Sequence, residues 1–126
     1  MNRVIHFEIS AENPERAVSF YKQVFDWDIQ KWAGPMDYWL VGTRDEKGTG
    51  INGAIKHRVV ANQGTVNSVH VSSIDAALQK IVQAGGKIVM QKTPIPGLGF
   101  HAYAQDTEGN LFGLLEYLES VQNQMK

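Results

Sequence analysis

Two polar residues near the amino terminus, His6 and Glu8, have side chains that can do acid and base chemistry. Apolar and polar residues alternate through residues 3–9 with a period of two, which is typical of a β-strand. The apolar face of this strand would consist of Ile5, Phe7 and Ile9. His6 and Glu8 share the other face, about 6.6 Å apart, where the carboxylate would raise the imidazole pKa towards neutrality and suit it to proton transfer. A structural ion pair is the alternative interpretation of the same two residues.

The composition excludes several classes of protein. The chain of 126 residues fits one domain, and its formal net charge of -1 gives no electrostatic case for binding nucleic acid or an anionic membrane. It contains no cysteine, so disulfides, thiolate nucleophiles and cysteine-ligated zinc are excluded. The sequence has neither the pattern of a secretory signal nor an apolar run long enough to span a bilayer. We therefore expect a cytoplasmic protein.

The strand leads into a predicted helix at residues 14–25. Asn13 is suited to cap this helix, and Pro14 is suited to its first turn. The apolar residues that recur at helical spacing, and should therefore press on a sheet, are Ala17, Phe20, Tyr21 and Val24. Three strands are expected to follow, at residues 28–31, 38–43 and 51–57.

The same order of elements recurs about 60 residues later, which indicates an internal repeat. Residues 66–72 alternate again, Ser73 can cap a second helix, and the pair Gly85-Gly86 can end it. Further strands are expected at residues 87–91, 100–105 and 111–117. A loop stiffened by Pro94 and Pro96 would join the first two of these strands, and a tight turn at residues 106–110 would join the last two.

This repeat predicts one α+β domain of residues 1–126 with mixed sheets. Its parts would be a first module at residues 1–60, a second module at residues 64–118 and a frayed tail at residues 119–126. Each module would curl a sheet around a shared cleft, with the helices packed outside.

Several motifs resemble the vicinal oxygen chelate superfamily, which includes glyoxalase I, bleomycin-resistance proteins, fosfomycin-resistance proteins and extradiol dioxygenases. In the first half they are His6, the pair Phe20-Tyr21 fourteen residues later, the run VFDW and the run GINGAI. In the second half they are IDAALQKIVQAGGKIV and IPGLGFHAYAQDTEGNLFGLLE. The resemblance implies two βαβββ modules forming a curved mixed sheet around a cleft, and it implies a homodimer.

In enzymes of this superfamily, a divalent metal ion is held by four positions that carry His, Glu or Gln. The resemblance places these positions on His6, Gly53, Val66 and Gly113. Since only His6 has a side chain that coordinates metal, we expect no metal cofactor. A shifted site that joins His70 to His6 and Glu8 is an alternative, whereas strand parity points Glu116 away from the cleft. The other interpretation is a wet cavity with hydrogen-bonded polar residues.

A cleft that has lost metal ligands gains apolar volume and suits a small organic ligand. We expect His6, Glu8 and His70 to anchor this ligand, with Trp39 and Phe100 as aromatic surface. The proline-stiffened loop at residues 93–99 would form its rim or serve as an ordinary strand connection.

The sequence thus predicts a glyoxalase- or bleomycin-resistance-like protein with a degenerate metal site that binds or transforms a small organic molecule. One alternative is a metal-dependent lyase, isomerase or dioxygenase that uses His6 with non-standard ligands, and another is a structural or regulatory module.

Overall fold

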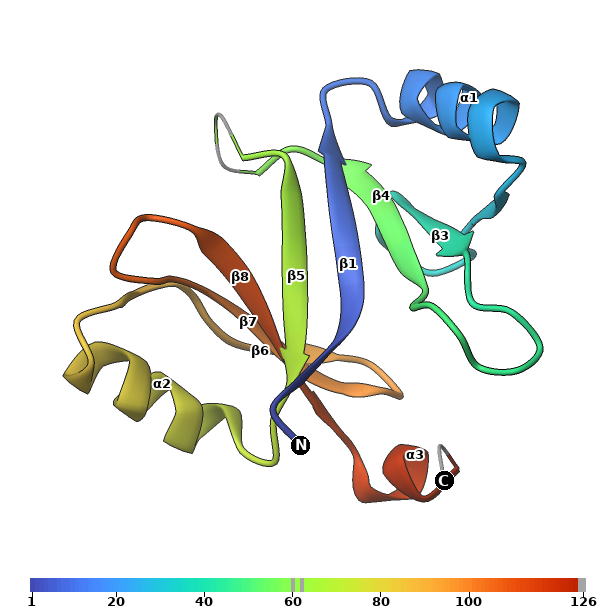
Figure 1. Ribbon diagram of the computed structural model, residues 1–126. Coiled ribbons are helices and arrows are strands. Elements are labelled where there is room, and N and C mark those ends of the chain that lie inside the picture. The colour runs from blue at the N-terminus through green and yellow to red at the C-terminus, as the bar shows by residue number, and fades with distance from the viewer. Residues whose placement is uncertain (60, 62, 125–126) are drawn as a thin grey trace. The chain divides into compact units, whose positions relative to one another are not determined.

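The computed structural model describes residues 1–59, 61 and 63–124 and divides the chain into two compact units (Figure 1). The first unit is Ile5–Val66, and the second consists of Met1–Val4 with residues 67–124. Residue 60, the last of the predicted first module, and residue 62, between the predicted modules, lie outside the described residues. The first four residues join the second unit, where the Asn2 N–H donates to the His70 carbonyl at 2.6 Å.

Each half of the chain has the order strand, helix, three strands, which confirms the predicted α+β class and the two βαβββ modules. The elements of the first half are β1 (Arg3–Ala11), α1 (Pro14–Phe25), β2 (Asp28–Lys31), β3 (Tyr38–Gly42) and β4 (Gly53–His57). Their strands lie in the order β2-β3-β4-β1, with β1 parallel to β4 and the other pairs antiparallel. The sheet is therefore mixed, as expected.

Helix α1 begins and ends as the sequence predicts. The Asn13 side chain accepts a hydrogen bond from the Arg16 N–H, and Asp26 ends the helix in the left-handed conformation with φ 56°. The expectation that Phe20 and Val24 press on the sheet is wrong, because they are 56% and 54% exposed. The residues of α1 that pack on the core are Ala17, Val18 and Tyr21. The buried stripe is centred near Tyr21, and Phe20 lies about 100° around the helix from it.

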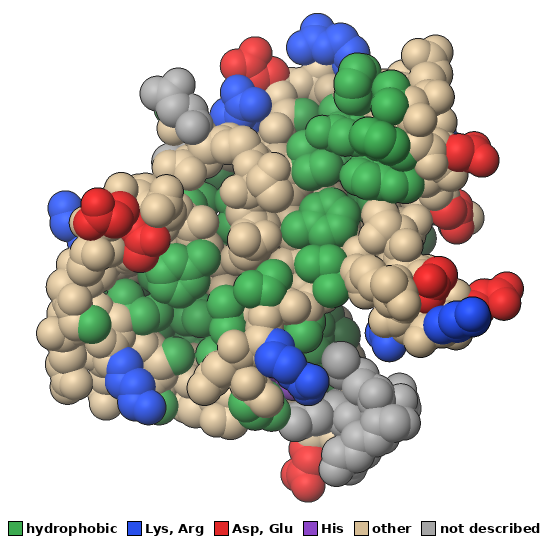
Figure 2. All heavy atoms as spheres, in the orientation of Figure 1, with side chains coloured by type: hydrophobic (Ala, Val, Ile, Leu, Met, Phe, Trp, Pro, Cys, Tyr) green, Lys and Arg blue, Asp and Glu red, His purple; other side chains and the backbone are tan. Residues whose placement is uncertain are grey.

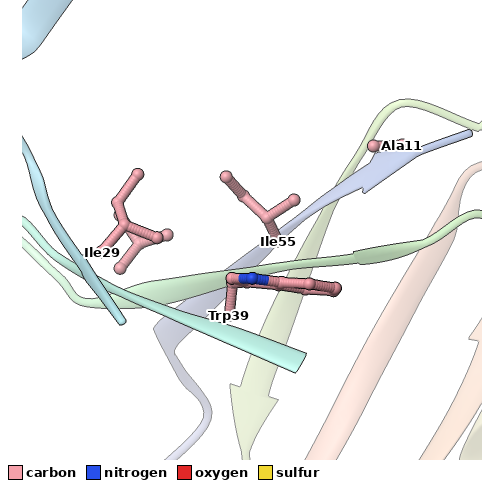
Figure 3. Close-up of a cluster of buried hydrophobic side chains, with 5 residues drawn as sticks. Ala11, Ile29, Trp39 and Ile55 are labelled. Atoms are coloured by element: carbon pink, nitrogen blue, oxygen red, sulfur yellow. The ribbon is translucent and has the colours of Figure 1, made fainter. Parts of the chain in front are cut away.

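The core of the first unit lies between α1 and one face of the sheet. Its buried side chains, drawn in Figure 3, are Ala11, Ile29, Trp39, Val41 and Ile55. Phe7 and Ile9 pack against this cluster, which confirms these two residues of the predicted apolar face of β1. Because side chains alternate along a strand, Tyr38 and Lys56 point to the sheet face opposite α1, as do His6 and Glu8.

The second half contains β5 (Thr65–His70), α2 (Ile74–Gln83), β6 (Lys87–Ile95), β7 (Gly99–Gln105), β8 (Leu111–Tyr117) and α3 (Glu119–Gln124). The strands lie in the order β5-β8-β7-β6, with β5 parallel to β8 and the other two pairs antiparallel. The buried cluster beside α2 consists of Val71, Ile74, Leu78, Ala102 and Leu114. None of the helices among the described residues has the length and apolar content needed to cross a membrane.

Two predictions for the second half need correction. The loop expected at residues 93–99 is mostly strand, since β6 continues to Ile95 and β7 begins at Gly99. Pro94 is compatible with this because β6 lies at an edge of the sheet, where a missing N–H is tolerated. The tail expected to be frayed forms α3 up to Gln124, and residues 125–126 lie outside the described residues.

Candidate functional site

A chain of hydrogen bonds joins His6, Tyr38 and Glu8 in the first unit. The Tyr38 hydroxyl donates to Glu8 Oε2 at 2.9 Å and lies 2.8 Å from His6 Nε2. A phenol has one proton, so a hydroxyl that donates to Glu8 must accept from His6. His6 therefore carries its proton on Nε2, and Nδ1 is the ring nitrogen that can accept a proton from a ligand.

Strand pairing brings these side chains together. In the sheet, β1 pairs with β4 and places Ser10 beside Lys56, while β3 pairs with β4 and places Tyr38 beside Lys56. Because side chains alternate with a period of two, residues 6, 8, 38 and 56 all share the face opposite the α1 core. The hydrogen-bonded chain is thus a direct consequence of strand register.

Lys56 adds a positive charge to this face. Its Nζ lies 3.9 Å from Glu8 Oε2, and the side chains of Lys56 and Glu8 are 14% and 6% exposed. A carboxylate as deeply buried as Glu8 requires both a counter-charge and hydrogen-bond donors. Lys56 supplies the counter-charge, and the Tyr38 hydroxyl is one of the hydrogen-bond donors.

The electrostatics of His6 differ from the sequence expectation. Burial lowers the pKa of His6 below its ordinary value of 6.5, and this effect exceeds the opposing influence of the Glu8 carboxylate, which raises it. The expectation that Glu8 would raise this pKa towards neutrality is therefore wrong in its net sign. At pH 7 the imidazole is neutral, which is the form that accepts a proton.

Two aromatic rings lie beside the ring of Tyr38. The imidazole of His6 is stacked on the Tyr38 ring at 6.4 Å between centroids, and Trp32 meets that ring edge-on at 6.3 Å. Trp39, which the sequence interpretation chose for the ligand site, is instead a core residue and is 8% exposed. Its place on the opposite face of β3 follows from the alternation of the strand.

Sequence reasoning did not assign Lys56 to the site, and it did not predict the hydrogen bonds of Tyr38 with His6 and Glu8. The sequence signal that could have placed Tyr38 and Lys56 on this face is the alternation of side chains along a strand. Trp39 and Ile55 are the core residues of β3 and β4. Their strand neighbours Tyr38 and Lys56 must then face the other way.

The positions that the family resemblance assigns to a metal do not fit one in this chain. Gly53 is on the α1 side of the sheet, since a Cβ there would lie 2.7 Å from ring atoms of Phe7, which packs on that core. The β4 residue beside Glu8 is Ala54. Val66 is 2% exposed and has no donor atom. Gly113 packs so closely that a Cβ would lie 2.6 Å from Ser68 Oγ. Among the residues that the structure describes, no three His, Asp or Glu side chains form a group that could hold a metal.

The remaining predicted site residues belong to the second unit. His70 is 8% exposed, and its Nε2 has no hydrogen-bond partner among the described residues. Its ring lies 5.1 Å from that of Tyr117, and its pKa is lowered by burial first and then by the positive N-terminus and Arg3. Phe100 packs against the α2 core and has the Lys92 ammonium 4.4 Å from its ring centroid.

Glu116 has a structural role in the second unit. Its Oε1 accepts a hydrogen bond of 2.8 Å from the Ile74 N–H at the start of α2. The carboxylate therefore caps a helix and lies on the side of the sheet that α2 covers.

A groove of about 550 Å³ also lies in the first unit, on the side of the sheet covered by α1. Its lining includes Ser10, Asn13, Arg16, Phe20 and Arg58. His6, Glu8 and Tyr38 do not line it, so this groove is separate from the hydrogen-bonded chain.

Comparison with known proteins gives one family and many similar structures. Residues 3–114 match the family model described as the Glyoxalase/Bleomycin resistance protein/Dioxygenase superfamily. A search of curated proteins found no significant match.

Among solved structures, a hypothetical protein from Bacillus halodurans has a TM-score of 0.69 at 12% identity and covers 94% of this chain and 96% of its own. A variant methylmalonyl-CoA epimerase from Streptomyces coelicolor, in complex with 2-nitronate-propionyl-CoA, has a TM-score of 0.67 at 12% identity, with coverage of 94% and 96%. The methylmalonyl-CoA epimerase from Mycobacterium tuberculosis has a TM-score of 0.62 at 15% identity, with coverage of 95% and 91%. At these identities the likeness concerns the fold.

Proposed function

Since this chain belongs to the Glyoxalase/Bleomycin resistance protein/Dioxygenase superfamily, we propose that it binds a small organic molecule beside His6 and exchanges a proton with it without a metal. The observation that carries this proposal is the chain His6 Nε2, Tyr38 hydroxyl, Glu8 carboxylate. A base oriented by a second group, which is itself held by a buried carboxylate, is an arrangement that suits general base catalysis.

The proposed chemistry uses His6 as the base. Its neutral imidazole takes a proton from an acidic C–H or O–H of the ligand onto Nδ1, while Nε2–H remains donated to Tyr38. The positive charge that develops on the ring is stabilised through the Tyr38 hydroxyl by the Glu8 carboxylate. The reverse transfer returns the proton to the ligand and restores the neutral ring.

The similar structures support an organic ligand. One of them holds 2-nitronate-propionyl-CoA, so a protein of this fold accommodates an acyl-CoA compound. Trp32 and Tyr38 supply aromatic surface beside His6 for the body of such a molecule. We further propose that the protein works as a cytoplasmic homodimer.

The test is a thermal-shift screen of small carbonyl compounds and organic acids, followed by calorimetric titration of each stabilising compound. The variants are His6→Gln and Tyr38→Phe, and His57→Gln is the matched control because His57 is an exposed histidine of the same unit. We expect affinity to fall at least about tenfold, or 1.4 kcal/mol, in the first two variants and to stay unchanged in the control.

A second measurement separates proton transfer from simple binding. Exchange of the ligand's acidic hydrogen with deuterated water, followed by NMR, should be accelerated by the native protein and not by His6→Gln. Binding that is indifferent to His6 and Tyr38 would contradict the proposal. If binding depends on His6 and Tyr38 but hydrogen exchange is not accelerated, the proposed function is reduced to sequestration of the ligand.

A further inference from the structure

The groove of about 550 Å³ beside α1 has no role in the chemistry proposed for His6. Its lining comes from the end of β1, the first turns of α1 and Arg58, which directly follows β4. The volume lies within the range of about 300–1,000 Å³ that is usual for sites of small organic ligands. A molecule of that size fits the groove, and the lining indicates its chemistry.

The charge of the lining is positive. Its charged side chains are two arginines, Arg16 and Arg58, and one glutamate, Glu12. Two guanidiniums and one carboxylate leave a net positive charge, and the Ser10 and Asn13 side chains of the lining are uncharged. The groove therefore attracts an anion more strongly than a cation.

The contacts of Arg58 leave donors for a ligand. Its Nη1 lies 3.4 Å from Glu12 Oε1, and its Nη2 donates to the Ser10 carbonyl at 3.3 Å. Charge-assisted hydrogen bonds are shorter, about 2.7–2.9 Å, and the Glu12 side chain is 77% exposed, so this ion pair is weak. A guanidinium also has more N–H groups than these two contacts use. A ligand oxygen can thus bind Arg58 beside Glu12 or in its place.

Arg16 is the second source of donors. Within the part of the chain that the structure describes, its guanidinium makes no hydrogen bond or ion pair. The backbone positions of both arginines are fixed, because the Arg16 N–H donates to Asn13 Oδ1 at 3.1 Å and the Arg58 N–H donates to the Ala11 carbonyl at 3.0 Å. The groove is therefore formed before any ligand binds, which lowers the cost of binding.

The rest of the lining offers apolar surface for the body of a ligand. It includes the side chains of Ile9, Ala11 and Ala17 and the ring of Tyr21. Apolar walls with a few polar groups that orient the ligand are typical of small-molecule sites. A ligand that matches this lining has an anionic group at one end and a flat apolar body.

We propose that this groove is a second binding site and that it takes a small aromatic anion, whose carboxylate or phosphate binds Arg16 and Arg58. The planar guanidinium suits this role because it can bind two oxygens of such a group at once. His6, Glu8 and Tyr38 do not line the groove. The inference therefore goes beyond the proposed function and does not depend on it.

The first experiment is calorimetric titration with benzoate, phenyl phosphate and the neutral control benzamide. At least one of the two anions should bind at least about tenfold more tightly than benzamide, and the tighter anion identifies the group that the arginines prefer. Arg16→Gln and Arg58→Gln should each lower this affinity at least about fivefold. Arg44→Gln, an equal change of charge at an exposed arginine between β3 and β4, is the matched control and should have no effect.

A second set of variants should change affinity in the opposite direction. Glu12→Gln removes the carboxylate that competes for Arg58, so anion affinity should rise about threefold. Glu46→Gln, an exposed glutamate between β3 and β4, is its control and should gain nothing. If Arg58→Gln lacks the native circular dichroism, Arg58→Lys takes its place. This variant keeps the charge but not the planar fork, and its loss of affinity should be smaller than fivefold.

The outcomes separate this inference from the proposed function. In His6→Gln, the binding that depends on the two arginines should remain. Anion binding that is lost in His6→Gln and is unchanged in Arg16→Gln and Arg58→Gln would overturn the inference and leave the proposed function standing. Absence of binding by both anions at about 10 mM, or benzamide that binds as tightly as the anions, would also overturn it.

Discussion

Burial fixes the protonation state of the two histidines that sequence reasoning selected. The pKa values of His6 and His70 are both lowered from 6.5 by desolvation. For His6 the Glu8 carboxylate opposes this effect, whereas for His70 the positive N-terminus and Arg3 reinforce it. Both imidazoles are therefore less protonated in the folded protein than in the unfolded chain at the same mildly acidic pH.

This predicts that the folded state loses stability in mild acid. The unfolded chain protonates both histidines near pH 6.5, and the folded chain protonates them only at lower pH. The unfolded state thus binds more protons in this window, so the free energy of unfolding falls as the pH decreases from about 6.5 through the folded-state pKa values. Urea unfolding at pH 7.5 and at pH 5.5 should show the loss.

Variants of the two histidines test whether these residues cause the loss of stability in mild acid. The double variant His6→Gln and His70→Gln should show a smaller loss of stability between the two pH values than the native protein. His57→Gln is the control, since this histidine is exposed at the end of β4. An unchanged pH dependence in the double variant would show that other groups cause the loss.

Gly53 illustrates how tightly a single residue can be constrained by its neighbours. A Cβ at this position would lie 2.5 Å from the Phe7 carbonyl oxygen and 2.7 Å from ring atoms of Phe7. We expect Gly53→Ala to lower the free energy of unfolding by about 1–3 kcal/mol, because the strand pair β1–β4 must separate to admit the methyl group. Gly64→Ala is the control, since a Cβ there meets nothing within 4 Å. Chemical denaturation of both variants measures the difference, and equal stabilities would contradict this account.

Among the elements, β8 and α2 are connected by a partly buried hydrogen bond. Glu116 of β8 accepts from the Ile74 N–H, and Ser73 accepts from the Ala76 N–H within the same helix terminus. These acceptors satisfy two of the N–H groups that every helix leaves unpaired at its start.

We therefore expect Glu116→Ala to lower the free energy of unfolding by about 0.5–2 kcal/mol, as loss of a capping group does. Glu116→Gln keeps an oxygen acceptor and should cost less. Glu119→Ala, at an exposed position in α3, is the control. Denaturant titration gives the values, and a Glu116→Ala protein as stable as the native one would show that this cap is replaced by water.

The elements were largely predictable from the sequence, because each has a local signal. Asn13 and Pro14 mark the start of α1, the bounds of β2 and β8 match the predicted ones, and the Ser73 cap opens α2. The site was less predictable, because the contact of Tyr38 with His6 depends on the register between separate strands. Local patterns place a residue on a face, but they do not say which residue of the next strand it meets.

The same limit explains the two errors on α1 and β6. The spacing of Phe20 and Val24 is helical, but which side of a helical stripe is covered depends on the sheet below it. Pro94 suggested a loop, since proline is disfavoured within a sheet, and only the strand order shows that β6 is an edge strand.

At the scale of the whole molecule, the exposed apolar residues of α1 have no role in the chemistry proposed for His6. Phe20, Val24 and Phe25 are 56%, 54% and 56% exposed, and all three belong to the same helix. Figure 2 shows hydrophobic side chains gathered at the upper right of the viewed face, near the place of α1 in Figure 1. Burial of a large apolar side chain contributes about 1.5–3 kcal/mol, so a surface of this kind favours association.

A second copy of the chain is the occupant that we propose for this surface, in keeping with the homodimer that the family resemblance implies. Light scattering coupled to size-exclusion chromatography should then give twice the chain mass of 14.0 kDa for the native protein. Phe20→Glu with Phe25→Glu should give the mass of one chain, because two buried charges would face each other across a symmetric interface. Val89→Glu, on the edge strand β6 and 43% exposed, is the control and should remain dimeric. A native protein with the mass of one chain at 0.1 mM, or a helix variant that still dimerises, would place the exposed face of α1 outside any interface between copies.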